Sequence, residues 1–306
     1  MTAARPLAPS PGRRQRRRRG ALVAWAFMAP LLVVNLLVIT GPGIASLLYS
    51  FTDWDGLGAA EFVGLANYVE LFGNPNVLAA ISHNLIWTLF FLTVPMGMAL
   101  LGAFLLSRLR RGQVLFRIVF FIPYVLATVV SAAVWRQLLS PTAGIGAALE
   151  SLGIDWLAET NFLGDPSLAL GSVAFINNWQ WWGFLLVLFV AAMQGVDPAL
   201  YEAARLDGAN AWREFWHITL PGIRPTLVFL TLMTIIWSFL VFDYVYILTQ
   251  GGPAGSTDVL STVLYRTAFG EQRAGYASAM AMLLTVISAA VVGGYLVLRK
   301  RLKWDV

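Results

Sequence analysis

Six long runs of apolar residues divide the chain, with short polar segments between them. Their approximate bounds are 21–50, 78–107, 114–139, 167–196, 224–250 and 274–298. Four runs contain no Asp, Glu, Lys or Arg, whereas the third carries Arg117 and Arg136 near its ends and the fifth carries Asp243. A helix rises about 1.5 Å per residue, so about 20 to 30 residues can cross a hydrocarbon core about 30 Å thick. The pattern predicts an all-α integral membrane fold with six transmembrane helices.

The composition distinguishes this chain from a soluble protein. Of its 306 residues, 58% are hydrophobic and 12% are charged, whereas a soluble domain carries roughly a quarter charged residues. A large soluble core made of buried helices is therefore disfavoured.

Basic residues are concentrated in alternate segments of the chain. Eighteen of the 21 Lys and Arg residues lie before the first run, between or beside the second and third, between or beside the fourth and fifth, or after the sixth. The other segments hold most of the acidic residues. By the positive-inside rule, both termini and the segment 197–222 face the cytoplasm. We therefore predict a basic cytoplasmic tail at 1–20, a membrane domain at 21–298 and a second basic tail at 299–306.

The basic amino terminus has two other interpretations. A signal peptide would need a short apolar core and a small-residue cleavage site, but the run 21–50 is longer and shows no such site. A nucleic-acid-binding tail is compatible with the seven Arg residues before the first run, yet an anchor that fixes orientation explains them equally well. We expect an uncleaved first span in a lipid bilayer and no nucleic-acid partner.

Several kinds of chemistry are excluded by residue types that the chain lacks. It has no Cys, which excludes disulfides and thiolate sites. Its two His residues lie in segments predicted on opposite sides of the membrane, so no His-based metal centre is expected. Its only lysines are Lys300 and Lys303, so no phosphate-binding Gly-Lys-Ser/Thr loop exists. We predict a non-enzymatic chain without catalytic residues, cofactor or metal, for which ATP energy would have to come from another subunit.

The cytoplasmic segment 197–222 combines helix signals with small and charged residues. Asp197 and Pro198 are typical of a helix start, and Gly208 permits a left-handed exit from that helix. A second helix follows and ends at Pro221, with an apolar face at helical spacing. The members of that face are Trp212, Phe215, Trp216, Thr219 and Leu220. From these residues alone, an interfacial linker and a docking site for a partner are equally supported.

A spaced motif in this segment resembles a known family. The motif consists of Glu202-Ala203-Ala204, then Gly208 after three residues, then Ile218-Thr219-Leu220-Pro221 after nine more. It resembles the EAA loop of the permease subunits of binding-protein-dependent ABC importers. The similarity extends over about 21–298, and the stretch from Phe242 to Pro253 resembles the carbohydrate branch, the maltose- and glycerol-phosphate-type permeases. The resemblance implies a type I ABC importer permease with a cytoplasmic coupling helix between spans four and five.

The resemblance also assigns roles to residues of this loop. It implies that Glu202 fixes the loop in its contact with an ATPase subunit, that Ala203 and Ala204 allow a close fit, and that Gly208 makes the turn. The candidate coupling residues are Glu202, Ala203, Ala204, Arg205, Asp207, Gly208, Leu220 and Pro221.

Partners and location follow from the same resemblance. It implies a second homologous permease subunit, two ATPase subunits that hold ATP and Mg and dock at 197–222, and an extracytoplasmic solute-binding protein, in a bacterial or archaeal cell membrane. The expected cargo is a sugar or oligosaccharide moved by alternating access. Glycerol phosphate, a polyol or an amino sugar stays open as cargo. An ion-coupled secondary transporter is a more distant alternative, and it would ordinarily show inverted repeats.

Candidate cargo-path residues lie in spans four and five. Asp243 is an acidic residue inside a span, which marks a functional candidate, and Tyr244 follows it; the alternative is a structural carboxylate satisfied by a neighbouring helix or by Arg136. In span four, aromatic faces and amides suit a sugar, although amides also join helices and Trp favours membrane interfaces. These candidates are Asn177, Asn178, Gln180 and Trp181. They spread around the helix, so we expect that some of them do not face a path.

Overall fold

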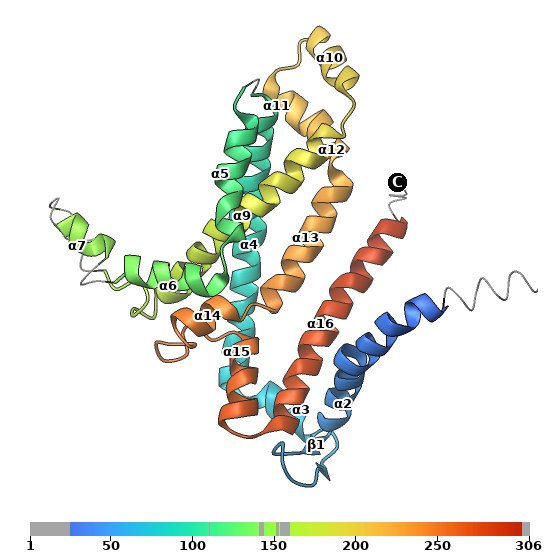
Figure 1. The fold of residues 1–306 in the computed structure, drawn as a ribbon, viewed down its shortest axis with the longest axis vertical. Helices are drawn as coiled ribbons and strands as arrows, with labels where there is room; N and C mark the ends of the chain where they lie inside the picture. Colours follow the sequence, from blue (N-terminus) through green and yellow to red (C-terminus); the bar gives the residue numbers. More distant parts are fainter. Residues whose placement is uncertain (1–24, 110, 141–143, 151–152, 154–159, 302–306) are drawn as a thin grey trace, which may run out of the picture.

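The computed structural model describes residues 25–109, 111–140, 144–150, 153 and 160–301. The predicted tail at 1–20 and the last five residues of the predicted tail at 299–306 lie outside these residues. The described chain is mostly helical (Figure 1), which confirms the predicted helical membrane fold. Within it, five helices are long and apolar enough to cross a membrane, and one bent pair would make a sixth span. The five are Trp25–Tyr49, Pro75–Ser107, Ala169–Gln194, Arg224–Leu248 and Ala274–Val297.

The first span leads into a short segment with two strands. The span contains a π-helical turn η1 (Leu36–Thr40) and continues as α2 (Gly41–Tyr49). Strand β1 (Thr52–Asp53) then pairs antiparallel with β2 (Glu61–Phe62), and α3 (Ala66–Gly73) follows. These two-residue strands are the one addition to the predicted all-α fold in the described chain. They lie beside the start of the last helix α16 (Ala274–Arg301), whose first turn donates from the Gly275 amide to the Trp54 carbonyl at 2.9 Å.

Two long helices form the centre of the molecule. Helix α4 (Pro75–Ser107) starts where the Asn74 side chain accepts a hydrogen bond from the Asn76 amide, and α9 (Ala169–Gln194) packs along it. Small and large apolar side chains of both helices pack into one buried core. The shared core includes Met96, Ala99, Ala103, Leu185, Leu186, Phe189 and Val190.

The third predicted span is a bent pair of helices. Helix α5 (Gln113–Val125) and helix α6 (Thr128–Leu138) meet at 94°, a bend that the predicted span over 114–139 did not include. The 13 residues of α5 rise only about 20 Å, less than the roughly 30 Å of a hydrocarbon core. The bend occurs because Leu126 and Ala127 have extended backbone, with ψ of 138° and 134°. The Leu126 carbonyl, which makes no helical bond there, accepts from Gln180 Nε2 at 2.6 Å.

The fifth predicted span, 224–250, is also interrupted. Helix α13 (Arg224–Phe239) ends before α14 (Asp243–Leu248) begins, and side chains from other helices satisfy carbonyls at the break. Asn84 Nδ2 donates to the Ser238 carbonyl at 3.0 Å, and the Ser261 hydroxyl donates to the Val241 carbonyl. Such side-chain partners make broken helices possible at membrane depth.

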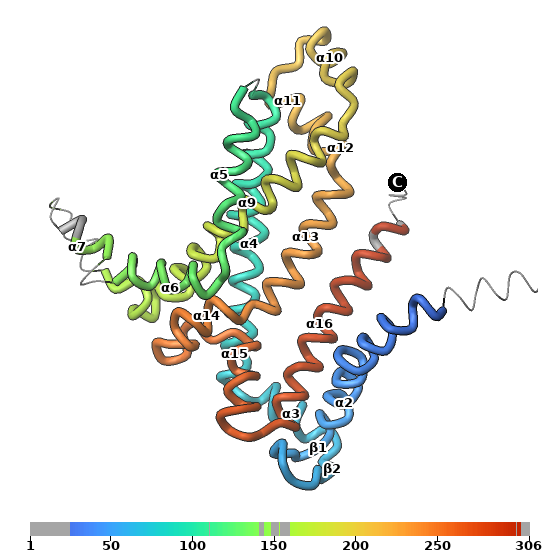
Figure 2. Tube along the Cα trace, in the orientation of Figure 1, coloured from blue at the N-terminus to red at the C-terminus, as the bar shows by residue number. Residues whose placement is uncertain are grey.

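The remaining elements lie at the two ends of the bundle or, at the left of Figure 1, beside it. The segment between α9 and α13 lies at the top of Figure 1. It consists of α10 (Pro198–Leu206), α11 (Ala211–Glu214), the π-helical turn η2 (Phe215–Thr219) and α12 (Leu220–Gly222). The trace in Figure 2 shows α2 beside the lower part of α16, and the two helices are in contact. The other elements are α7 (Ile145–Glu150), α15 (Leu260–Tyr265) and η3 (Arg266–Gly270). Helix α16 runs to Arg301, past the predicted boundary at 298.

Candidate functional site

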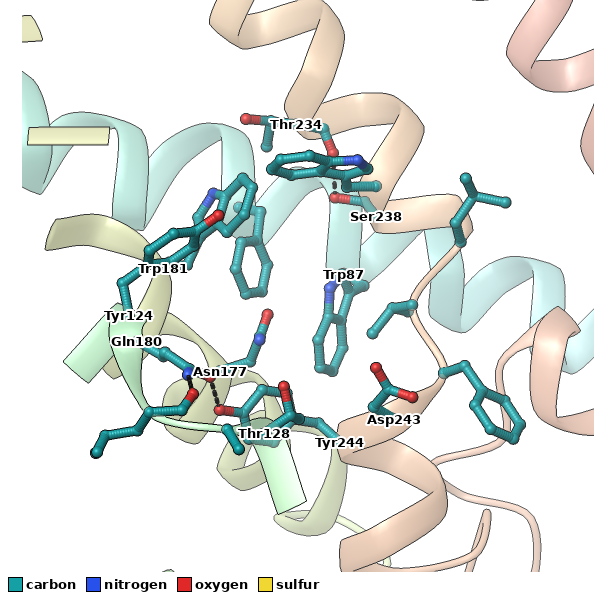
Figure 3. Close-up of a pocket in the computed structure, with 17 residues that line it drawn as sticks. Trp87, Tyr124, Thr128, Asn177, Gln180, Trp181, Thr234, Ser238, Asp243 and Tyr244 are labelled. Atoms are coloured by element: carbon teal, nitrogen blue, oxygen red, sulfur yellow. Dashed lines mark hydrogen bonds between the residues drawn. The ribbon is translucent and has the colours of Figure 1, made fainter. Parts of the chain in front are cut away.

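A cavity of about 390 Å³ lies where the two helix breaks meet. Its wall is built from the middle of α4, the α5–α6 bend, α9 and the α13–α14 break (Figure 3). The residues that line it are Trp87, Phe91, Tyr124, Leu126, Ala127, Thr128, Asn177, Gln180, Trp181, Thr234, Trp237, Ser238, Leu240, Val241, Phe242, Asp243 and Tyr244. Five of the six residues predicted for a cargo path are in this wall.

Asn178 is the predicted residue that the wall does not include. Its side chain is 4% exposed and faces α4, where Nδ2 lies 3.7 Å from the sulfur of Met98. Its Oδ1 atom is buried without a hydrogen-bond partner in the described chain. Asn178 therefore belongs to the α4–α9 packing, while its neighbour Asn177 faces the cavity in Figure 3.

Gln180 and Tyr244 line the wall, but their polar atoms are engaged with each other. The Tyr244 hydroxyl donates to Gln180 Oε1 and lies 3.2 Å from the Ser131 hydroxyl of α6. Because Gln180 also donates to the Leu126 carbonyl, these residues join α9, α14 and the α5–α6 bend. Their hydrogen bonds therefore hold the two helix breaks together.

The Asp243 carboxylate makes no hydrogen bond or ion pair in the part of the chain that the structure describes. It is exposed, forms no salt bridge there, and stands at the first position of α14. The alternative partner considered for it, Arg136, lies in the last turn of α6 and is not paired with it. Figure 3 shows Asp243 and Asn177 facing the cavity from different sides. This geometry favours the cavity-lining interpretation over a structural carboxylate.

Aromatic residues from other helices complete the wall, and the sequence alone did not identify them. The rings of Trp181 and Trp237 meet edge to face with centroids 4.4 Å apart, and Tyr124 lies 6.3 Å from Trp181. Trp87 on α4 also faces the cavity. Two polar atoms at this wall, Trp181 Nε1 and Thr234 Oγ1, are buried without a partner in the described chain. The sequence did not show which way these rings point, because Trp87 and Trp237 occur in predominantly apolar runs without a distinct polar face.

Electrostatically, the cavity carries a carboxylate and no cation. Among the described residues of the wall there is no Arg, Lys or His, and Asp243 is the acidic one. Hydroxyl and amide groups supply the other polar contacts. The wall can therefore offer ring faces, hydrogen bonds and one negative charge to a bound molecule.

The second region is the loop segment that contains the predicted coupling residues. Asp197 accepts a hydrogen bond from the Ala199 amide at 2.9 Å and Pro198 takes the first helical position, as predicted. Gly208 has φ of +77°, a conformation that favours glycine. No residue of α10 is buried in the described structure, and Leu206 is 89% exposed. Of the predicted residues, Glu202, Ala203, Arg205, Asp207, Gly208 and Pro221 are exposed, and Ala204 and Leu220 are half-buried.

The second helix of this segment differs from its prediction. It is not one regular amphipathic helix, because α11 passes into the π-helical turn η2 before α12. Phe215 and Thr219 of the predicted apolar face are buried, whereas Trp212 and Trp216 are 61% and 47% exposed. Helix α12 ends at Gly222, one residue after the expected end at Pro221, and α13 begins at Arg224.

Glu214 was missed by the sequence reasoning. It is 2% exposed, and its carboxylate accepts hydrogen bonds from Arg108 at the end of α4 and from Arg205 Nε at 3.1 Å. In a regular helix Glu214 would lie on the side opposite the predicted apolar face of Trp212, Phe215 and Trp216, so the apolar pattern gave no signal for its burial.

Comparisons with known proteins identify the family of the chain. Residues 93–304 match the family described as "Binding-protein-dependent transport system inner membrane component". The chain is 36% identical over 274 residues to the probable ABC transporter permease protein YurN of Bacillus subtilis, covering 88% of this chain and 93% of that protein. It is 31% identical over 268 residues to the multiple sugar-binding transport system permease protein MsmF of Streptococcus mutans, covering 87% and 91%. A crystal structure of a bacterial ABC transporter that imports the acidic polysaccharide alginate contains a chain with a TM-score of 0.83 and 25% identity, covering 94% of this chain and 99% of that one.

Proposed function

This chain belongs to the binding-protein-dependent transport system inner membrane components, and on that premise we propose that it is the permease subunit of an ATP-driven importer for a sugar or oligosaccharide. The observation that carries the cargo class is the cavity at the two helix breaks. Ring faces can stack on the C–H surfaces of a sugar, while amides and hydroxyls bond its hydroxyl groups. Its volume of about 390 Å³ is within the usual range for small-molecule sites of about 300–1,000 Å³.

The charge of the wall favours a neutral sugar or an amino sugar over glycerol phosphate. A phosphate about 5 Å from the Asp243 carboxylate would be repelled by about 3 kcal/mol at an effective dielectric constant of 20. That repulsion is roughly a hundredfold in affinity. A phosphorylated cargo would need its countercharge from the second permease subunit, since the described wall residues include no cation.

The exposed α10 supports the second part of the proposal, that ATPase subunits dock on segment 197–222. A short capped helix transmits a push better than a loop, and α10 buries none of its residues within this chain. The chain lacks a phosphate-binding loop of its own, so hydrolysis belongs to the partners. Closure of two ATPase subunits would then shift the permease between inward- and outward-facing packings.

Several parts of the assembly follow with this proposal. They are a second homologous permease subunit, an extracytoplasmic solute-binding protein, and a multi-pass position in a bacterial or archaeal cell membrane. The basic residues put segment 197–222 and both termini in the cytoplasm.

The test is reconstitution of the complete importer in lipid vesicles. We expect ATP-dependent uptake from a panel of labelled neutral, amino and phosphorylated sugars, with the phosphorylated compounds excluded. Glu202→Lys, or Gly208→Leu at its positive φ, should lower uptake per ATP hydrolysed while the subunit still inserts and assembles. Glu61→Lys is the matched control, because Glu61 is an exposed acidic residue in β2, on the predicted outer side. Uptake driven by an ion gradient without ATP would refute the transport mechanism.

A further inference from the structure

A buried carboxylate connects the loop segment to the long helix α4. Glu214 accepts from Arg108, which follows the last residue of α4, and from Arg205 on α10. The Glu214 side chain is 3% exposed, whereas those of Arg108 and Arg205 are 35% and 62% exposed. One carboxylate therefore joins three helices, and two of them lie about a hundred residues apart in the chain.

Apolar and polar contacts surround this ion cluster. The Arg108 guanidinium lies 4.5 Å from the centre of the Phe104 ring, and Phe104 contacts Phe215 at 4.9 Å between ring centroids. On the side of α10, the Tyr201 hydroxyl lies 3.0 Å from the Thr219 hydroxyl, which donates to the Glu214 carbonyl at 3.3 Å. The cluster is thus part of a continuous contact from α10 through α11 and η2 to α4.

Helix α10 has few other attachments within the chain. None of its residues is buried, and its backbone connections are the turn at Gly195–Asp197 and the loop that contains Gly208. A push on α10 without the ion cluster would be carried by these two connections and by the Tyr201 contact with the core. With the cluster, the push reaches Arg108 and then α4, which is continuous from Pro75 to Ser107. Phe91 in the cavity wall lies 17 residues before Arg108 on this path, about 25 Å along the helix.

A stabilising role alone does not explain a buried carboxylate that two arginines bind. Removing a carboxylate from water is costly, and apolar residues of similar volume often replace such clusters without loss of stability. What an ion cluster adds is a fixed geometry between the elements that it joins. The cationic Arg108 also follows the carboxyl end of α4, where the helix dipole favours a positive charge.

On the basis of the proposed function, we propose that Glu214 is a positioning residue that locks α10 to α4, so that ATP-driven movement of the coupling segment reaches the cavity. Without the lock, α10 still binds the ATPase subunit and ATP is still hydrolysed. The movement is then absorbed by the segment between α9 and α13, and cargo uptake per ATP falls.

The test uses the complete importer in vesicles and measures ATP hydrolysis and sugar uptake in the same preparation. Glu214→Gln keeps the shape of the side chain and removes its charge, and we expect uptake per ATP to fall roughly threefold to tenfold with assembly unchanged. Glu70→Gln is the control, because Glu70 forms an exposed ion pair with Arg273 at 2.7 Å outside this segment. It should leave uptake per ATP unchanged.

A cross-linking experiment distinguishes a loss of positioning from a general defect of the variant importer. The chain has no Cys, so Arg108→Cys with Arg205→Cys places one thiol at the end of α4 and the other on α10, in an importer whose other subunits are also free of Cys. A thiol-cleavable bifunctional cross-linker should restore uptake per ATP to at least half of the original value, and reduction should abolish the gain. The two single-Cys variants should show no such recovery.

The outcomes distinguish this inference from the proposed function. No ATP-driven sugar uptake by the unmodified importer would refute the function and, with it, the role of Glu214. Normal uptake per ATP in Glu214→Gln, in an importer that does transport sugar, would refute the inference alone. So would a cross-linked double-Cys variant that stays uncoupled although it assembles.

Discussion

Substituting Gly183 by Ala should separate α5 from α9. A Cβ atom at this position would lie 1.8 Å from the Phe120 carbonyl oxygen and 2.7 Å from its carbon. Contacts of a Cβ below 3.0 Å are essentially never found, so the two backbones must move apart by at least about 1.2 Å, the difference between these distances. Because backbone atoms cannot rotate away as a side chain can, we expect a cost near the upper end of about 1–3 kcal/mol for overpacking.

The same displacement should disturb the α5–α6 bend. Gln180 lies one turn before Gly183 in α9 and donates to the Leu126 carbonyl at 2.6 Å. A shift of more than 1 Å would lengthen this bond and leave that carbonyl poorly satisfied, which costs about 1–3 kcal/mol in an apolar setting. Both effects should lower the thermal midpoint by an amount of the order of 5 °C.

The assay is thermal unfolding of the assembled importer in detergent, with Gly171→Ala as the matched control. Gly171 is in the same helix and a Cβ there would meet nothing within 4 Å. Its replacement by Ala should be neutral or slightly stabilising, because Ala is favoured over Gly in helices by up to about 1 kcal/mol. Equal midpoints for Gly183→Ala and Gly171→Ala would refute the close contact between α5 and α9.

Two further predictions concern ionisable groups. The Arg273 side chain, through its hydrogen bonds, holds the pKa of the Glu70 carboxyl below its ordinary value of 4.5. The ion pair therefore stabilises the folded protein at pH values above 4.5. This stabilisation is lost as the pH falls through the lower pKa that Glu70 has in the folded protein. Because both side chains are about 40% exposed, the loss should stay below ~1 kcal/mol, and thermal midpoints of Arg273→Gln and the unmodified protein should converge at low pH. Asp243→Asn should strengthen inhibition of sugar uptake by a phosphorylated analogue by up to about a hundredfold relative to inhibition by the neutral sugar. If the ratio of these two inhibition constants is the same in Asp243→Asn and in the unmodified importer, the assignment of Asp243 to the cargo path is contradicted.

Local signals explain which features the sequence could predict. An Asp-Pro pair and a glycine after the helix determine α10 because capping and positive φ depend on a few neighbouring residues. The apolar runs predict membrane helices for the same reason, since length and lack of charge suffice. These features involve no distant contact, and the structure has them at Asp197, Pro198 and Gly208.

The helix breaks could not be predicted in this way. Pro123 lies near the first break, but Pro95 lies inside the continuous α4, so proline alone does not indicate where a membrane helix ends. The carbonyls at the breaks are satisfied by Gln180 from α9 and Asn84 from α4. Both partners lie in other spans, so the sequence near a break contains no sign of them.

The breaks also explain why the candidate cavity contains polar groups. A continuous helix in lipid satisfies its own backbone, whereas a broken one requires polar side chains at the same depth. Gln180 serves the break in α5–α6 and Tyr244 binds Gln180, so the polar part of the wall is supplied by the hydrogen bonds that make the breaks possible. The carboxylate of Asp243 satisfies no break, and it is therefore the wall residue whose charge a purely structural account leaves unexplained.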